Sequence, residues 1–176
     1  YFVYRIGCKV KAFFRNKYVN SCCTSVLSSP PRILGDITIN AKNVKFGSNV
    51  VIYPGVYIWG ENIEIGNNVN IGVGTIIFSC KRVYIGDDTI IAGQCYIIDS
   101  NHSIDKNMVI QKQSLKTAVE GIFIGKDVWI GAQCFILKGA KINNGAVIGA
   151  QSLVNKEIPS YAVAFGTPAE VKSYRK

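Results

Sequence analysis

The sequence is poor in several residue types that common functional classes require. Its 176 residues include one histidine and one methionine, and 11 acidic residues stand against 20 basic ones. No apolar run of about 18 residues occurs, so we expect nothing in the chain to span a membrane. The first residues, YFVYRIGCKVKAFFRNKYV, mix aromatic and basic side chains, whereas a secretory signal needs a longer apolar core and a small-residue cleavage site. The length supports one domain with flanking elements.

Six cysteines are present, but their positions disfavour both a metal site and disulfides. Cys22 and Cys23 are adjacent, and no second pair lies at zinc-ligand spacing. With a single histidine, a Cys/His zinc site is not expected, and we predict no metal. Cys95 and Cys134 fall at predicted inward positions, where a thiol acts as a small apolar filler and not as a nucleophile. Free thiols are typical of a reducing compartment, so we expect a cytoplasmic protein.

The formal net charge of +9 is concentrated at the ends of the chain. Residues 1–32 hold six basic residues and no acidic one, and we expect this segment to be helical. Such a patch suits an anionic membrane surface, a nucleic acid or a phosphorylated ligand, with a solvated helix face as the alternative. Nucleic acid is the least favoured partner, because no finger motif or aromatic-studded basic sheet motif is present. Peripheral contact with the inner membrane through this segment stays an open hypothesis.

Aliphatic residues recur every six positions through most of the chain. The series is Phe46, Ile52, Ile58, Ile65, Ile71, Ile77, Ile85, Ile91, Ile97, Ile124, Ile130, Ile136, Ile142, Ile148 and Val154. A period of six fits neither a helix nor a lone strand, but it is typical of a parallel β-helix whose coils have three sides. A small residue usually follows four positions later and is expected to fill the corner. Glycine often follows the aliphatic directly, where we expect it to allow backbone angles that other residues resist.

Grouped by threes, these positions give five coils, followed by a C-terminal extension at 160–176. The coils are 46–64, 65–84, 85–123, 124–141 and 142–159, and Ile33 and Ile39 hint at a partial coil before them. The step is seven from Ile58 to Ile65 and eight from Ile77 to Ile85, which predicts small corner bulges.

One step is far longer. From Ile97 to Ile124 it is 27, so roughly 21 residues leave the β-helix of 33–159 and return. Long loops in compact domains are usually functional or disordered. The excursion loop at 99–121 is therefore the first place to search for chemistry.

The only histidine, His102, lies three residues into the excursion, in the run IIDSNHSID. Histidine takes and returns a proton near neutral pH without a large pKa shift. A loop on a rigid scaffold is a typical position for a functional residue. Asp99 and Asp105 flank the histidine, and either would orient the ring or stabilise its charged form. A solvated surface histidine is the alternative, but the setting favours catalysis.

Three stretches are selective: IGDDTIIAGQCYIIDSNHSID, WIGA and VNKEIPSYAVAFGTPA. Through them the sequence, from about Ile33 to Lys172, resembles the hexapeptide-repeat acyltransferases. It is closest to the bacterial sugar and polysaccharide O-acetyltransferases of that family. The resemblance implies a mainly β fold, a left-handed parallel β-helix of about five coils with a protruding loop, a short N-terminal helical segment and a short C-terminal tail. It also implies a homotrimer with active sites between neighbouring chains.

The resemblance assigns roles to individual residues. His102 matches the family's general base, which activates an acceptor hydroxyl for attack on the acetyl-CoA thioester. The backbone N–H of Ala132, just after the Trp-Ile-Gly run, matches the donor to the developing oxyanion. Trp129 matches the tryptophan that lines the acceptor and pantetheine channel, although an outward aromatic at a subunit contact is the alternative.

Further residues match positions that contact the donor in the family. Ala92, Ala150 and the Asn155–Lys156 corner match positions that meet pantetheine and the nucleotide end of acetyl-CoA. Lys172 and Arg175 would pair with its phosphates, or would simply be solvated. The list of cofactor contacts that the resemblance implies is therefore Ala92, Trp129, Ala132, Ala150, Asn155, Lys156 and Lys172.

The acceptor is less well defined. Galactoside-type members carry an asparagine where this chain has Gly72, and Asn70 is not the aligned residue. The basic, aromatic N-terminus instead resembles enzymes that acetylate surface glycans. We therefore expect O-acetylation of a surface polysaccharide or its precursor by direct transfer in a ternary complex. Two alternatives stay open: another acceptor (a nucleotide-sugar amine, a free sugar or serine), or a non-catalytic β-helix that serves in assembly or glycan binding.

Overall fold

The structure is a computed structural model in which Ser21 and residues 30–176 are described. The helical segment expected within residues 1–32 therefore lies almost entirely outside the described residues. Within the described part of the chain, no helix has the length and apolar character needed to cross a bilayer.

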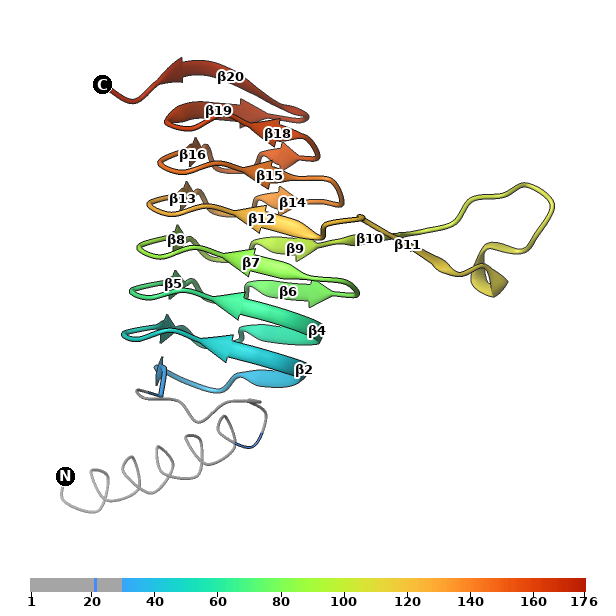
Figure 1. Cartoon of the computed structure of the whole chain (residues 1–176), viewed down its shortest axis with the longest axis horizontal. Coiled ribbons are helices and arrows are strands. Elements are labelled where there is room, and N and C mark those ends of the chain that lie inside the picture. The colour runs from blue at the N-terminus through green and yellow to red at the C-terminus, as the bar shows by residue number, and fades with distance from the viewer. Residues whose placement is uncertain (1–20, 22–29) are drawn as a thin grey trace.

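The chain winds into a stack of short coils with three sides (Figure 1). Face 1 is an eight-stranded sheet. In spatial order it contains β1 (Arg32–Ile33), β3 (Val51–Ile52), β5 (Asn70–Ile71), β8 (Ile90–Ile91), β13 (Trp129–Ile130), β16 (Val147–Ile148), β19 (Ala162–Gly166) and β20 (Ala169–Tyr174). All its pairs are parallel except the last, β19 with β20.

Two long strands, β2 (Thr38–Phe46) and β4 (Tyr57–Ile65), bend around a corner and join faces 2 and 3 into one sheet. Face 2 continues with β6 (Ile76–Ser79), β9 (Tyr96–Ile98), β14 (Phe135–Ile136) and β17 (Leu153–Val154). Face 3 continues with β7 (Val83–Ile85), β12 (Ile122–Ile124), β15 (Lys141–Ile142) and β18 (Glu157–Ile158).

The six-residue pattern is confirmed as the core. Each face stacks its inward aliphatics directly on one another; on face 1, Ile91 pairs with Ile130 and Ile130 with Ile148. The series residues from Ile52 to Val154 are at most 3% exposed, and the small corner residues are equally buried. A stack of identical inward side chains at inter-strand spacing removes nearly all of this apolar surface from water.

The glycines that follow the aliphatics have a different role from the one expected. The glycines concerned are Gly47, Gly66, Gly72, Gly86, Gly125, Gly131 and Gly149. None of them has a positive φ; the left-handed residue comes two positions later, as at Asp88 after Gly86 and Gln133 after Gly131. A Cβ on Gly131 would instead lie 2.5 Å from the backbone nitrogen of Ala150 in the next coil. Glycine is therefore required because successive coils approach closely at the corners, and not because of its backbone freedom.

The coil has about seven turns, more than the five expected. The first turn starts at Ile33. The last turn continues through Ala164, which comes six residues after Ile158 and pairs with Ile148. Alanine holds the inward position there, so a search for large aliphatics misses it. Residues 162–174 complete face 1, because β20 folds back antiparallel on β19 and covers the end of the stack.

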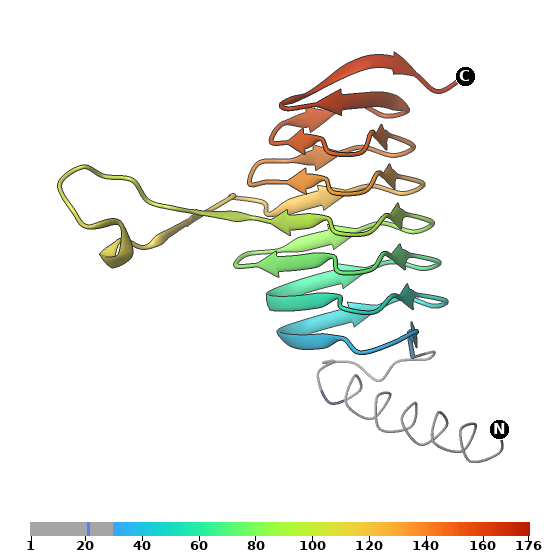
Figure 2. The same cartoon turned by 180° about the vertical axis from the view of Figure 1, so that it is seen from behind.

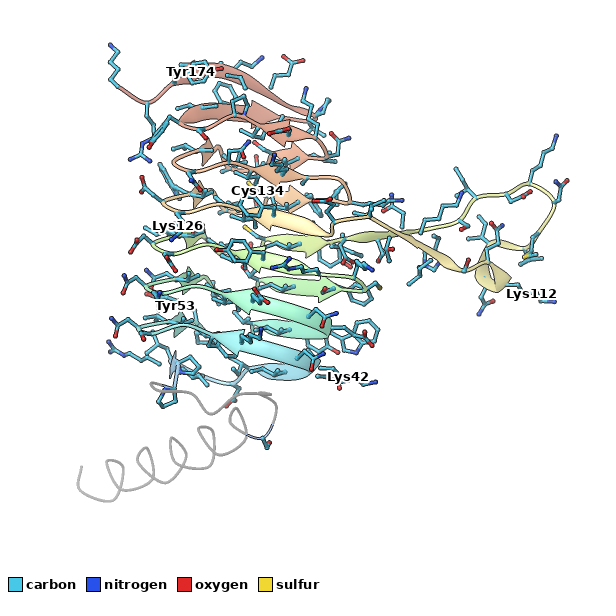
Figure 3. All side chains as sticks on the ribbon, viewed as in Figure 1. Lys42, Tyr53, Lys112, Lys126, Cys134 and Tyr174 are labelled. Carbon is cyan, nitrogen blue, oxygen red and sulfur yellow. The ribbon has the colours of Figure 1, made fainter. Side chains whose placement is uncertain are left out.

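The excursion leaves between β9 and β12 and forms an arm that points away from the stacked coils in both views (Figures 1 and 2). Its base is a two-stranded antiparallel ribbon of β10 (Ser100–His102) and β11 (Leu115–Thr117). A 3-10 turn, η1 (Ile110–Lys112), lies near its far end, where Lys112 is labelled in Figure 3. The predicted protruding loop is confirmed. Left-handed winding stays a prediction of the resemblance.

Candidate active site

The arm holds His102 clear of the coil. His102 ends β10 and pairs with Leu115 across the ribbon, and its side chain is exposed. The hydroxyl of the next residue, Ser103, donates to the Ser114 carbonyl at 2.7 Å and ties the two strands together just beyond the imidazole. An exposed imidazole on a braced ribbon is suited to proton transfer with a bound substrate.

Asp99 lies at the root of the arm and is fully buried. Its two carboxylate oxygens accept hydrogen bonds from the backbone N–H groups of Cys80, Lys81 and Arg82, at 2.8, 2.7 and 2.9 Å. The carboxylate thus contacts the coil below the arm and not the His102 ring. Asp105 likewise accepts from the Asn107 backbone N–H at 2.8 Å, in a turn at the far end of the arm. Neither neighbouring carboxylate shows a contact with the imidazole.

The far end of the arm directs polar groups inward and apolar groups outward. Gln113 accepts from the Asp105 N–H at 2.8 Å and donates to the carbonyls of Asp105 and Met108 at 2.9 and 2.7 Å. The apolar residues there are exposed: Ile104, Met108, Val109 and Ile110. An ordered loop with this inverted pattern is typical of a segment that contacts another surface.

The residues that the resemblance assigns to the donor occupy two different corners. Ala92, Ala132 and Ala150 lie at the corner between faces 1 and 2 (corner 1/2: residues 92–95, 131–134 and 149–152), where Ala132 and Ala150 share one register position and Ala92 precedes it by one residue. Asn155 and Lys156 lie at the corner between faces 2 and 3 (corner 2/3: residues 80–82, the arm, 137–140 and 155–156). His102 projects from corner 2/3. One chain therefore does not bring its histidine and its Ala132 corner together.

The surface beside Ala132 combines free backbone donors with an apolar face. The Ala132 N–H donates no hydrogen bond to any described residue, nor do the equivalent amides of Gly93 and Ala150 in the adjacent coils. Trp129 is 55% exposed on face 1, where it pairs with the exposed Ile90 one coil below. This corner thus offers N–H donors next to an indole and an aliphatic side chain.

Lys172 and Arg175 are both engaged within the chain. The Lys172 ammonium lies 2.8 Å from Glu170 on β20. The Arg175 guanidinium donates to the Asp127 carboxylate at 2.8 Å and to the Gly145 carbonyl at 3.0 Å, between faces 3 and 1. Lys172 would have to exchange partners to meet a phosphate, whereas Arg175 fastens β20 to the coil.

The two corner thiols are inside the coil, as Figure 3 shows for Cys134. Cys95 donates to the Gly131 carbonyl at 3.2 Å, and Cys134 donates to the Gly149 carbonyl at 3.1 Å. Interaction with the neighbouring Cys134 thiol, followed by burial, raises the pKa of the Cys95 thiol. Within the described residues, no three His, Cys, Asp or Glu side chains form a potential metal site.

Sequence reasoning gave no indication of a hollow of about 620 Å³ on face 3, beside the returning strand of the arm. Tyr84 and Phe123 stack at 5.2 Å in its lining, and the Arg82 guanidinium lies 5.8 Å from the Tyr84 ring centre. The two aromatics occupy the outward positions just before Ile85 and Ile124. Alternation predicts that they point outward, but nothing in the sequence marks them as a pair.

Comparisons with known proteins agree with this architecture. Residues 121–156 match the family model described as bacterial transferase hexapeptide (six repeats). The same length of chain, 36 residues, is 58% identical to a galactoside O-acetyltransferase of Lactococcus lactis subsp. lactis (strain IL1403), which is 20% of this chain and 17% of that protein. The match thus spans about a sixth of the curated relative.

Two solved structures share the fold over most of the chain. AntD, an N-acyltransferase from Bacillus cereus in complex with dTDP and 3-hydroxybutyryl-CoA, has a TM-score of 0.74 at 21% identity, with 92% of this chain and 88% of that chain covered. A maltose O-acetyltransferase from Clostridium difficile 630 has a TM-score of 0.63 at 24% identity, covering 92% and 75%. The family model thus confirms the resemblance to the hexapeptide-repeat transferases over residues 121–156, and the solved structures show the same fold over most of the chain.

Proposed function

We propose that the protein is an acetyl-CoA-dependent O-acetyltransferase that modifies a sugar hydroxyl. The observation that carries the proposal is the single histidine, exposed at the end of β10 on a braced arm that interrupts a transferase-type coil. The galactoside and maltose O-acetyltransferases among the similar proteins support the reaction class, and AntD supports an acyl-CoA donor.

His102 would accept the proton of the acceptor hydroxyl as its oxygen attacks the thioester carbonyl. The carbonyl oxygen then carries the developing negative charge, which the Ala132 N–H would stabilise. Collapse of the tetrahedral species breaks the C–S bond, and the protonated imidazole returns its proton to the departing thiolate. General-base catalysis of this kind typically contributes roughly 10²–10⁴ in rate, and one oxyanion donor about 10²–10³.

This mechanism needs two copies of the chain. Because His102 projects from corner 2/3 and Ala132 lies at corner 1/2, the arm of one copy would carry its imidazole to the Ala132 corner of the next. The exposed apolar end of the arm would be buried in the same contact. We therefore favour a homotrimer with three shared sites.

The corner residues fit a thioester donor. The exposed Trp129 and Ile90 would contact the pantetheine arm, and the small side chains of Ala92 and Ala150 at the same corner would leave space beside it. Lys156, exposed two coils above the arm, and Lys172 would pair with phosphates as charge-assisted donors.

For the acceptor we favour a surface polysaccharide or its precursor, with a cytoplasmic enzyme that contacts the inner membrane peripherally. N-acylation of an amino sugar is the second candidate. A specific observation favours it, because the N-acyltransferase AntD matches with a TM-score of 0.74 over nearly the whole of both chains.

The test measures release of free CoA from acetyl-CoA against sugars, amino sugars and glycan fragments. His102→Ala should lower transfer by roughly 10²–10⁴-fold while CoA binding and oligomeric mass stay unchanged. Asn101→Ala, which alters the exposed residue next to it, is the matched control and should keep wild-type transfer. Transfer by His102→Ala near the wild-type rate would refute the base assignment, and wild-type protein that binds no CoA would refute the function.

A further inference from the structure

The corner directly below the arm is enlarged. The step from Ile77 to Ile85 is eight, two more than the period, and the extra length falls in the turn of residues 80–82 between β6 and β7. β6 and β7 pair with β9 and β12, the strands between which the arm is inserted. The turn therefore lies immediately beneath the root of the arm.

The Asp99 carboxylate accepts hydrogen bonds from all three backbone N–H groups of the 80–82 turn. The donors are Cys80, Lys81 and Arg82, at 2.7 to 2.9 Å, and Asp99 has no solvent exposure. Hydrogen bonds from N–H groups to an ionised carboxylate are among the strong ones, and a buried carboxylate needs such partners. The adjacent Ser100 also accepts a hydrogen bond from the Cys80 thiol at 3.4 Å.

The returning strand is attached to the same turn. The Ile122 N–H donates to the Arg82 carbonyl at 2.9 Å. Gly121 has a φ of +78° and lies so close to that carbonyl that any Cβ would overlap it. The Ala118 N–H donates to the Asp99 carbonyl at 2.9 Å and joins the two ends of the arm. Both ends of the excursion are thus fixed to one three-residue turn.

We propose that Asp99 is a positioning residue, whose carboxylate fixes the direction of the arm by binding the 80–82 turn and thereby places His102. This role rests on the proposed function for its catalytic consequence, but the mechanical part stands without it. His102 lies three positions after Asp99 along an extended strand, so a small rotation at the root displaces the imidazole by about an ångström or more. Displacements of about 1 Å can cost on the order of 10²-fold in rate.

The chain offers a matched control on the same coil. Asp87 also accepts a backbone N–H from the coil below, from Asn67 at 2.9 Å, but it lies at the corner between faces 3 and 1, away from the arm. Asp99→Asn and Asp87→Asn make the same chemical change. Only Asp99→Asn directs an N–H₂ donor at the N–H groups of the 80–82 turn.

The experiment compares the two variants in the intact oligomer by hydrogen exchange and by steady-state kinetics. Asp99→Asn should raise amide exchange at 100–117 by about tenfold or more and lower kcat by on the order of 10²-fold, with the Kd for CoA within about twofold of wild type. Asp87→Asn should leave exchange at 100–117 and kcat unchanged. If Asp99→Asn does not fold, Asp99→Ser, which keeps one acceptor oxygen, is judged by the same criteria.

Three results would overturn the proposal. Unchanged arm exchange with unchanged kcat would show that the carboxylate does not fix the arm, and unchanged exchange with reduced kcat would show that Asp99 acts directly in the chemistry. Equal effects of the two aspartate variants would show a general loss of coil stability. Because hydrogen exchange needs no substrate, the arm can be tested even if no acetyl transfer is found and the proposed function fails.

Discussion

Replacing Gly131 with alanine tests whether the corner glycines are required by close stacking or by backbone angles. The added Cβ would lie 2.5 and 2.8 Å from the nitrogen and Cα of Ala150 and 2.9 Å from the carbonyl carbon of Gly149. All three atoms belong to the backbone, so no side chain can rotate away. Coil 124–141 would have to separate from the coil above it at corner 1/2.

The magnitude follows from two opposing effects. Overpacking of this kind costs roughly 1–3 kcal/mol. Gly→Ala at an unstrained φ stabilises by about 0.4–1 kcal/mol, because the unfolded chain loses freedom. The net expectation is a destabilisation of about 1–2 kcal/mol, or a melting temperature lower by roughly 3–6 °C for a chain of this size.

The assay is thermal and urea unfolding of Gly131→Ala beside Gly74→Asn. Gly74 has a φ of +65° and open space, since the nearest atom to an added Cβ lies 3.8 Å away. Asn49 and Asn68 adopt the same left-handed conformation in this chain, so asparagine should be tolerated at position 74 within about 0.5 kcal/mol. A Gly131→Ala protein as stable as wild type, or more stable, would refute the stacking argument.

Three further predictions concern the surface. The Lys126 ammonium lies 2.7 Å from the Asp87 carboxylate, and its hydrogen bond is the main reason why the pKa of Asp87 is below the ordinary value of 3.8. Because the pKa of Asp87 is lower in the folded than in the unfolded protein, this interaction stabilises the fold above about pH 4, and the stabilisation is lost as the pH falls through the folded pKa. The stability gap between wild type and Asp87→Asn should therefore close on acid titration, and a gap that persists at about pH 2 would contradict this. Arg175→Ala removes the bonds that fasten β20 and should cost about 1 kcal/mol, seen as faster hydrogen exchange in β20 with the inner coils unchanged. Val109→Asp at the far end of the arm should lower the oligomeric mass in light scattering, whereas Val119→Asp, at an 89% exposed position near its root, should not; equal masses for both would argue against burial of the arm end.

Most of the core was predictable from the sequence because every side of each coil buries one aliphatic of the six-residue repeat, whereas the second buried aliphatic on face 3, as at Ile63, Val83 and Ile122, lies outside that repeat. Ile91, Ile130 and Ile148 can be identified as core residues from the sequence, because the six-residue repeat places them in register with one another. The last turn was missed because Ala164, which continues the repeat, is too small to be recognised as a core residue. The predicted role of the glycines, backbone freedom, was wrong for a related reason. The close approach that requires them is between successive coils, and the sequence of one coil does not show how near the next coil lies.

The candidate site was predictable only in part. His102 stands out because it is the single histidine and lies in the longest break of the period. The hydrogen-bond partners of Asp99 could not be predicted, because backbone N–H groups have no sequence signature and these hydrogen bonds join two different coils. The separation of His102 from the Ala132 corner was also hidden, since it depends on which of the three corners each residue occupies.

The breaks in the period carry more functional information than the period itself. Every step from one inward residue to the next across the other two corners is six, whereas successive coils cross corner 2/3 in steps of 7, 7, 8, 27, 6 and 4, from Ile39 to Phe46 through Val154 to Ile158. One edge of the prism thus absorbs every change in length, while the ladders on all three faces keep their register. The corner with two extra residues, between Ile77 and Ile85, lies directly under the corner with 21 extra residues, between Ile97 and Ile124, and Asp99 joins the two by hydrogen bonds. In this chain the arm is anchored where the coil beneath it also departs from the repeat, because the lengthened 80–82 turn presents three backbone N–H groups to the Asp99 carboxylate. In a related sequence, a lengthened corner one coil before a long excursion should therefore be accompanied by a carboxylate at the first residue of the excursion, and its replacement there should release the arm.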